Sequence, residues 1–362
     1  MPVQTISTIQ LIIEFVIGLA ILIFLHEFGH FIACKLLKID VEEFGFGLPP
    51  RMLTLFELKG TKYTLNWIPF GGFVRPKGEL NPDEPGGLAA ANPWKRIVVP
   101  LAGPVMNLIT ALILFLAIYG IIGSLPDRNR VQLVEIAPNS PASAAGLQAG
   151  DILVSVGGVS IHSLDAVRPI IYANLGKPLE FVYERNGITH DVSVTPMANP
   201  GDSGAVGIYM NYPMRPFTLW GAVPESFKSM VDYMKELFSS IGQMIRGQSS
   251  SASGGRLVGI KGMFDLYSSV RESSGTTGIP VIVNVFLFFA SISISLGLMN
   301  LLPIPALDGG RIVFALPELI TRKRIPPKYE GWVIAVSFVL LILLMIFINA
   351  QDIIHPIPTP VP

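Results

Sequence analysis

A zinc-binding pattern lies inside a hydrophobic segment near the start of this 362-residue chain. Residues 11–25 contain a single charged side chain and continue without a break into the pentapeptide HEFGH at residues 26–30. On a helix, residues four apart share one face, so His26 and His30 are predicted to present two imidazole nitrogens to one metal ion. Glu27 follows the first of them and is predicted to act as the general base that deprotonates water. Ionisable groups at membrane depth are costly unless they have partners, so the pattern indicates a functional site.

The composition predicts several membrane spans. Half of the residues are hydrophobic, 14% are charged, and the net charge is zero. This balance gives no indication of a nucleic-acid partner and favours contact with the lipid bilayer. Four segments are long and apolar enough to cross a bilayer: residues 9–33, 97–122, 280–302 and 331–348. The only cysteine, Cys34, cannot form an internal disulfide.

Basic residues predict the orientation of these spans. Residues 35–96 hold nine Lys and Arg and residues 311–328 hold five, whereas the two termini hold none. By the positive-inside rule, both basic segments are cytoplasmic. The termini and residues 123–278 are therefore expected outside a bacterial cell (inner) membrane, with the catalytic residues near its cytoplasmic side.

The connection between the first two spans is predicted to hold a β region at about residues 44–75. Its stretch 63–74 is rich in aromatic and β-branched residues, with Pro69 and two glycines where a hairpin would turn. A re-entrant hairpin beside the metal is the favoured interpretation, with Asn66 and Gly71 as substrate contacts. A small β subdomain on the inner membrane surface is the alternative.

The second span opens with two prolines, Pro100 and Pro104, placed around Ala102 and Gly103. Small residues allow helices to approach closely, so this stretch is expected to pack against the first span. Asn107 follows and needs a polar neighbour. Asn107 is expected either to pack against the first span or to lie near the metal site.

A small external domain is predicted at residues 128–213, where short β-rich runs alternate with turns. The run that begins at Pro138 and ends with Gly150-Asp151-Ile152-Leu153, together with the Gly157-Gly158 turn, resembles a circularly permuted bacterial PDZ domain. The resemblance implies that residues 206–209 form a strand to which an extended peptide adds, with Gly207 and Ile208 as substrate contacts. Residues 214–279 are expected to form an external amphipathic helix at 217–247, a flexible Ser/Gly-rich linker at 248–255 and a segment at 256–270 that is open between loop and short helix.

The second half of the site is predicted at the end of the third span. The sequence there runs from Asn300 through two prolines to Asp308-Gly309-Gly310. A catalytic zinc with two His ligands needs a third protein ligand, and Asp308 is the best candidate at the same depth. Capping of the following helix is the alternative for Asp308. Asn300 is expected either to donate its amide to a substrate carbonyl or to pack between helices.

These motifs together resemble the site-2 protease family of intramembrane zinc metalloproteases, and most of all its bacterial RseP-like members. The resemblance covers essentially the whole chain, from residues 1–127 as the first half of the membrane core to residues 280–362 as the second. It implies His26, His30 and Asp308 as ligands of one Zn²⁺ and Glu27 as general base. One recognisable PDZ domain, where well-known members carry two, puts the transfer of their substrate-gating model in doubt.

The resemblance also implies substrates and partners. It predicts regulated intramembrane proteolysis of single-span membrane proteins, such as anti-sigma factors trimmed first by another protease, or remnant signal peptides. Two other functions stay open: a non-catalytic membrane PDZ scaffold that binds exported peptide ends, and a metal transporter. An intact Glu27 argues against the scaffold, and polar residues clustered at one depth argue against the transporter.

Overall fold

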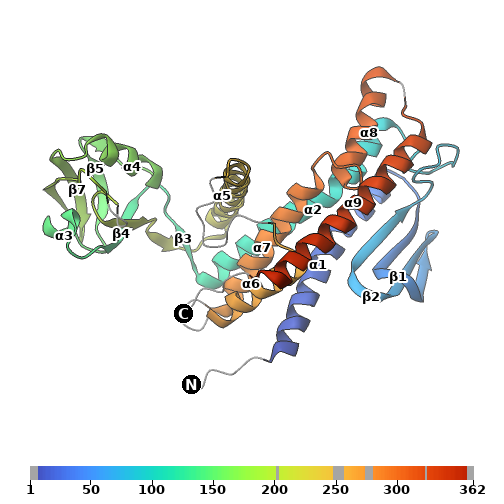
Figure 1. The fold of residues 1–362 in the computed structure, drawn as a ribbon, viewed down its shortest axis with the longest axis horizontal. Coiled ribbons are helices and arrows are strands. Elements are labelled where there is room, and N and C mark those ends of the chain that lie inside the picture. The colour runs from blue at the N-terminus through green and yellow to red at the C-terminus, as the bar shows by residue number, and fades with distance from the viewer. Residues whose placement is uncertain (1–6, 201–203, 248–256, 274–279, 323, 357–362) are drawn as a thin grey trace. The chain divides into compact units, whose positions relative to one another are not determined.

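The computed structural model describes residues 7–200, 204–247, 257–273, 280–322 and 324–356. The linker predicted at residues 248–255 lies outside these ranges. The chain forms two compact units (Figure 1). One consists of Ile122–Glu225, and the other combines Met1–Ile121 with Ser226–Pro362.

Four helices of the described residues are long and apolar enough to cross a membrane, which confirms the predicted number of spans. They are α1 (Thr8–Leu36), α2 (Pro93–Ile122), α7 (Val281–Asn300) and α9 (Pro327–Ile354). At about 1.5 Å per residue, each reaches across ~30 Å of hydrocarbon. Three of them are longer than predicted, because the flanking residues of mixed polarity continue the helix.

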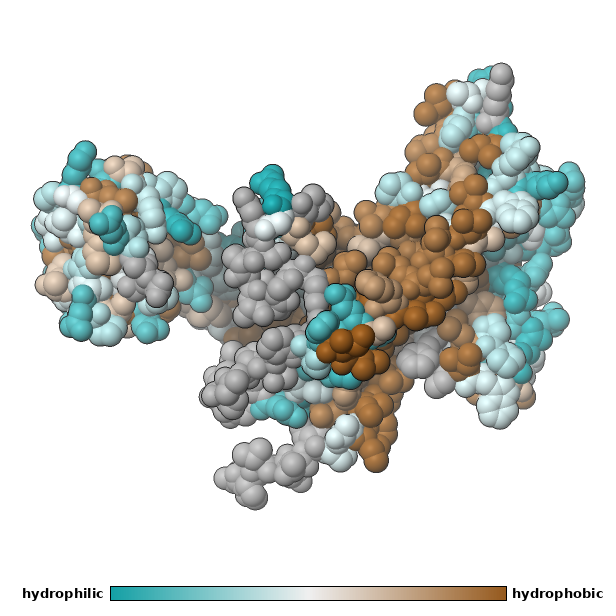
Figure 2. All heavy atoms as spheres, in the orientation of Figure 1, coloured by the Kyte–Doolittle hydropathy of each residue, from teal (hydrophilic) through white to brown (hydrophobic). Residues whose placement is uncertain are grey.

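The surface of the helical unit fits a lipid environment. Along α9, large apolar side chains are exposed, among them Phe338 at 57%, Leu343 at 56% and Phe347 at 64%. Figure 2 shows this apolar surface following the length of the helix. An aqueous environment would penalise such a stripe, whereas hydrocarbon accepts it.

The helix α2 begins earlier than predicted. Its first residue is Pro93, so Pro100 and Pro104 lie inside the helix and do not form its start. Each proline removes one backbone donor of the helical ladder. Both prolines are buried, as are Gly103 between them and Val99 before them, and the carbonyl of Val99 accepts a hydrogen bond from a side chain of α1.

The β region consists of β1 (Val41–Leu58) and β2 (Thr61–Pro76), which pair antiparallel. The tight turn lies at Lys59–Gly60, where both φ values are positive, at 51° and 76°. The predicted turn at Pro69 and the two glycines is present as a second reversal, because residues 62–65 and 72–75 pair with residues 43–46 in opposite directions; the two arms have β1 between them and do not pair with each other. There β2 bends, with Gly71 at φ +65°, so that Phe44 of β1 pairs with Tyr63 on one side and Val74 on the other. Residues 72–76 consequently lie at an edge of the sheet.

A buried carboxylate stabilises this bend. Glu43 is 3% exposed, and its carboxylate accepts hydrogen bonds from Arg51 Nε at 3.0 Å and Thr64 Oγ1 at 2.8 Å. Arg75 Nη1 lies 3.3 Å from the same carboxylate. Burial alone would raise the pKa of Glu43, but the hydrogen bonds from Arg51 and Thr64 lower it overall. One anion thus connects three segments of the sheet.

Three further helices complete this unit: the C-terminal part of α5 (Leu219–Ile245), α6 (Ile260–Ser273) and α8 (Asp308–Thr321). The segment left open between loop and short helix is therefore helical from Ile260. The C-terminal end of α6 is bound to α1, because Glu14 accepts hydrogen bonds from Tyr267 Oη at 2.8 Å and Arg271 Nε at 2.9 Å. Burial and the bond to Glu14 raise the pKa of Tyr267 to about 12. Its N-terminal end is capped from α9 by Asp352, which accepts from the backbone N–H of Gly259 and Gly262.

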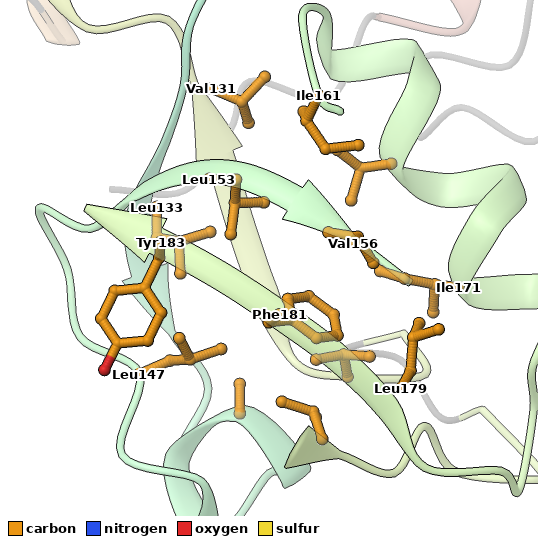
Figure 3. Packing of buried hydrophobic residues seen from close by; sticks show 14 of the residues in the cluster. Val131, Leu133, Leu147, Leu153, Val156, Ile161, Ile171, Leu179, Phe181 and Tyr183 are labelled. Carbon is orange, nitrogen blue, oxygen red and sulfur yellow. The ribbon is translucent and has the colours of Figure 1, made fainter. Parts of the chain in front are cut away.

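The Ile122–Glu225 unit is built on an antiparallel sheet with the order β8-β7-β5-β4-β9, in which β6 also pairs with β5. Its elements are β4 (Val131–Ile136), α3 (Pro141–Ala144), β5 (Ile152–Val156), β6 (Val159–Ser160), α4 (Leu164–Ala173), β7 (Leu179–Arg185), β8 (Ile188–Val194) and β9 (Ile208–Asn211), with β3 (Ser124–Pro126) paired to β10 (Met214–Pro216). Figure 3 shows side chains of β4, β5 and β7 meeting in one core, with Leu133 and Phe181 fully buried. The strand β9 is at an edge of this sheet.

The core of this unit should tolerate truncation poorly. Leu153 is 2% exposed, whereas its neighbour Val154 is 42% exposed. Leu153→Ala is expected to lower the free energy of unfolding of the unit by about 2–5 kcal/mol, and the matched Val154→Ala by roughly 0.5 kcal/mol or less. Urea-dependent pulse proteolysis of the full chain in detergent measures both. Equal losses for the two variants would contradict the burial assignment.

Candidate metal centre

Two imidazoles of α1 point to one spot. His26 and His30 are 8% and 7% exposed, and their Nε2 atoms are 3.2 Å apart. They occupy one face because they lie four residues apart on a continuous helix. The sequence pattern predicted this juxtaposition.

The third group comes from the other end of the chain. Asp308 Oδ2 lies 3.1 Å from His26 Nε2 and 3.4 Å from His30 Nε2. Asp308 is the first residue of α8, and the N-cap position before it is Leu307. Its carboxylate faces the two imidazoles. Capping of α8 was the alternative role considered for Asp308, but the N-cap position belongs to Leu307.

The arrangement fits a tetrahedral zinc ion. Zinc binds His nitrogen and carboxylate oxygen at about 2.0–2.2 Å, which places tetrahedral ligand atoms roughly 3.3–3.6 Å apart. The three observed separations, 3.1, 3.2 and 3.4 Å, agree within a few tenths of an ångström. Within the described residues, His26, His30 and Asp308 form a group whose ligand atoms all lie within 4.8 Å of one another.

Hydrogen bonds from α2 orient both rings. His30 Nδ1 donates to the carbonyl of Val99 at 2.8 Å, which leaves the lone pair of Nε2 directed at the centre. His26 Nδ1 lies 3.1 Å from the side-chain amide of Asn107. Asn107 Oδ1 is buried without a hydrogen-bond partner in the described structure. Turning the amide about its axis lets that oxygen accept from His26 Nδ1–H and gives His26 the same tautomer as His30.

Glu27 enters the same cavity, of about 350 Å³, which it lines together with His26, His30, Asp308 and Asn300. The backbone N–H of Val74 donates to Glu27 Oε2 at 3.2 Å. This bond orients the carboxylate and connects it to the edge segment of the sheet. The cavity therefore combines a metal-ligand set, a carboxylate and a side-chain amide.

The other predicted contacts lie elsewhere. Asn66 is buried, and its amide donates to the carbonyls of Phe46 and Gly47 at 3.3 and 3.1 Å. Gly71 packs against α1, where an added Cβ would come 2.3 Å from Ile23 Cγ2. Both residues shape the bend of β2. Gly207 and Ile208 belong to the Ile122–Glu225 unit, at the beginning of its edge strand β9.

Sequence reasoning missed two charged residues of the cavity. Glu79 and Arg311 both line it and form an ion pair with each other. Arg311 follows Asp308 by three residues, so the two share a face of α8. The three-residue spacing of Asp308 and Arg311, and the acidic residue shortly after β2, were the sequence features that could have indicated this ion pair. The pair connects the end of the β region to the helix that carries Asp308.

Comparison with known proteins decides the family. Residues 14–344 match the model of peptidase family M50. The chain belongs to this family. It is a zinc metalloprotease of the site-2 protease type, as the sequence predicted.

Two relatives match nearly the whole length of this chain. A relative from Clostridium perfringens, provisionally named a zinc metalloprotease, is 34% identical over 349 residues, which cover 96% of this chain and 99% of the relative. The zinc metalloprotease RasP of Geobacillus kaustophilus is 27% identical over 431 residues, with 96% and 99% covered. Among solved structures, the PDZ domain of the SdrC-like protein from Listeria monocytogenes matches with a TM-score of 0.21 and 18% identity, covering 23% of this chain and 87% of that one.

The geometry predicts which substitutions remove the metal. Purified peptidase is expected to hold one zinc per chain, and His26→Ala, His30→Ala and Asp308→Ala each remove one of three ligands and should lose most of it. Glu27→Gln should keep it, because the carboxylate is beside the ligand set and is not part of it. Asn107→Leu should weaken zinc affinity by roughly 10–100-fold through the loss of ring orientation. Elemental analysis and competition with a chelator measure these effects. Full zinc occupancy in Asp308→Ala would refute the three-ligand assignment.

Proposed function

We propose that the peptidase cleaves single-span membrane proteins within the bilayer, with His26, His30 and Asp308 holding the zinc and Glu27 as general base. The observation that carries the proposal is the position of Glu27, which shares a cavity with the three ligand atoms at the end of a membrane-spanning helix. When bound, zinc polarises the scissile carbonyl and increases the acidity of water.

The side chains of the cavity divide the proton transfers and the binding of substrate. Glu27 takes the proton from the attacking water and passes it to the nitrogen of the leaving amine. Its hydrogen bond from Val74 N–H keeps the carboxylate directed into the cavity. Asn300, on the same cavity wall, is proposed to donate its amide to the substrate carbonyl oxygen as negative charge develops.

The β region is proposed to present the substrate in an extended form. A helical substrate satisfies its own peptide groups, so a peptide bond must leave the helix before it can be cut. Residues 72–76 lie at an edge of the sheet, and Phe73 and Val74 of this segment line the cavity. An unwound substrate can pair with that edge as a further strand, which brings one peptide bond to Glu27. This interpretation places the β region at membrane depth.

The Ile122–Glu225 unit is proposed to be an external PDZ domain that controls access and takes no part in the chemistry. The position of β9 at a sheet edge suits the addition of a peptide strand. Gly207 is unsuited to a larger side chain, since its φ is +77° and an added Cβ would come 2.3 Å from Ser140 Cβ. The half-buried Ile208 is the better position at which to test peptide binding along β9. Trimmed anti-sigma factors and remnant signal peptides are the proposed substrates.

Cleavage should depend on Glu27. Wild type and Glu27→Gln are co-expressed with a panel of tagged single-span membrane proteins, and fragments are followed by immunoblotting. At least one substrate should give a fragment with the wild type and none with Glu27→Gln, because loss of a general base costs about 10²–10⁴-fold in rate. Identical fragment patterns for the two proteins would exclude this mechanism. Val154→Ala, an exposed change outside the cavity, serves as a control with intact catalytic residues.

The orientation is tested by labelling. Cysteines are introduced at positions 59, 174 and 349 in a Cys34→Ser background, and intact cells are treated with a membrane-impermeant thiol reagent. Because basic residues favour the cytoplasm, position 59 should stay unlabelled while positions 174 and 349 react. Labelling of position 59 in intact cells, with none at position 174, would reverse the proposed orientation.

A further inference from the structure

One guanidinium enters the cavity that holds the metal-ligand set. Arg311 lines this cavity together with the carboxylates of Glu27, Glu79 and Asp308, and it is the one Lys or Arg among the described residues of the wall. Arg311 follows Asp308 by three residues on α8, a spacing at which an acidic and a basic side chain can form an ion pair. The function proposed above leaves this cation without a role.

A cation at this position can compete with zinc for Asp308. Desolvation lowers the pKa of the Arg311 guanidinium, but the charges of Glu79, Asp308 and Glu27 raise it overall. The guanidinium is therefore within electrostatic range of the ligand carboxylate. An ion pair between Arg311 and Asp308 would occupy oxygen atoms that a zinc ion needs.

The observed partner of Arg311 is Glu79 instead. Arg311 Nη1 donates to Glu79 Oε1 in a close ion pair. The Asp308 carboxylate meanwhile stays 3.1 Å from His26 Nε2 and 3.4 Å from His30 Nε2. Glu79 thus holds the guanidinium on a partner outside the ligand set.

A second pocket, of about 80 Å³, adjoins the ion pair, because Glu79 and Arg311 line it as well. Glu330 is the other acidic residue in the described wall of this pocket, and Arg96 Nη2 already lies 3.9 Å from its carboxylate. A guanidinium released from Glu79 would therefore turn to the carboxylates of the metal cavity, where no second Lys or Arg lines the described wall.

The backbone that carries Glu79 is held by contacts of its own. Two residues earlier, Lys77 N–H donates to the carbonyl of Asp40 at 2.8 Å, and the Lys77 carbonyl accepts from Leu88 N–H at 2.9 Å. The segment is thus bonded on both edges. Its position does not depend on the ion pair alone.

The helix that carries Arg311 is also held by other contacts. Near its start, Gly310 packs so closely on the preceding loop that an added Cβ would overlap the carbonyl of Ile304. Toward its other end, Glu318 forms an ion pair with Arg96 of α2. The ion pair at the cavity is therefore one of several contacts that place α8, and its specific effect is on the guanidinium.

We propose that Glu79 is a positioning residue for the metal centre: it binds Arg311 and keeps that guanidinium away from Asp308, whose carboxylate stays free for zinc. The proposal deepens the function proposed above and rests on its ligand assignment. The charges agree with it. Glu27, Glu79 and Asp308 carry three negative charges, and Arg311 with a bound Zn²⁺ carries three positive ones, so the loaded cavity is neutral where a net charge is costly.

The test separates the two members of the ion pair. Glu79→Gln leaves Arg311 free to turn to Asp308 and should lower zinc affinity by about tenfold or more, as for other residues that orient metal ligands. Arg311→Gln breaks the same ion pair but removes the competing cation, so its zinc affinity should equal or exceed that of wild type. The double variant Glu79→Gln/Arg311→Gln should regain the wild-type affinity. Competition with a chelator, on the full chain in detergent, measures the zinc affinity of each protein.

Glu184→Gln is the matched control. The side chains of Arg130 and Glu184 are 42% and 35% exposed, against 39% and 36% for Arg311 and Glu79. Their ion pair belongs to the Ile122–Glu225 unit, which contains none of the metal ligands. Loss of this ion pair should leave zinc affinity unchanged.

Three results would overturn the proposal. Unchanged zinc affinity in Glu79→Gln is the first. Equal losses in Glu79→Gln and Arg311→Gln, or a double variant no better than Glu79→Gln, would show that the ion pair acts only as a link between elements. None of these results bears on the ligand assignment, which Asp308→Ala tests, or on cleavage, which Glu27→Gln tests. The proposed function can therefore stand while this inference fails.

Discussion

Burial of polar groups within an apolar layer is the constraint on which the helical unit depends. Two histidines, a glutamate and an aspartate lie together at the end of a membrane-capable helix, where an unpaired ionisable group costs several kcal/mol. Each is therefore engaged. The imidazoles bond to Val99 and Asn107, Asp308 faces both of them, and Glu27 accepts from Val74. These partners come from α2, α8 and β2, so satisfying the polar groups assembles the unit around them.

Close helix packing makes this assembly possible. Gly29 and Gly103 bring α1 and α2 into backbone contact, and prolines on either side of Gly103 loosen the ladder of α2. The carbonyl of Val99, directly before the first of these prolines, accepts a hydrogen bond from His30.

Ion pairs connect some elements in addition to the apolar core. Glu79 and Arg311 connect the end of the β region to α8, and Glu14 and Arg271 connect α1 to α6. Partly exposed pairs of this kind contribute little net stability, since solvent screening and the cost of ordering two long side chains offset the attraction. Their geometry instead selects one arrangement of the helices. The Ile122–Glu225 unit has its own core around Leu133, Leu153 and Phe181, as Figure 3 shows.

The sequence by itself determined the features whose causes are local or additive. The number of spans follows from the length and hydropathy of each segment, and the facing of His26 and His30 follows from the period of a helix. The family follows from motifs and was confirmed by comparison. The candidate for a third ligand followed from the chemistry of zinc and the counts of basic residues.

Only the tertiary structure decided what depends on contacts between distant segments. It brought Asp308 to within 3.4 Å of histidines about 280 residues earlier. It also placed β1 between the two arms of the turn predicted at Pro69 and its glycines, and it added a tight turn at Lys59–Gly60. Asn66 and Gly71 became parts of the bend, and Glu79 and Arg311 became parts of the cavity. No short sequence window contains these relations, since they arise from packing between segments that are distant in the chain.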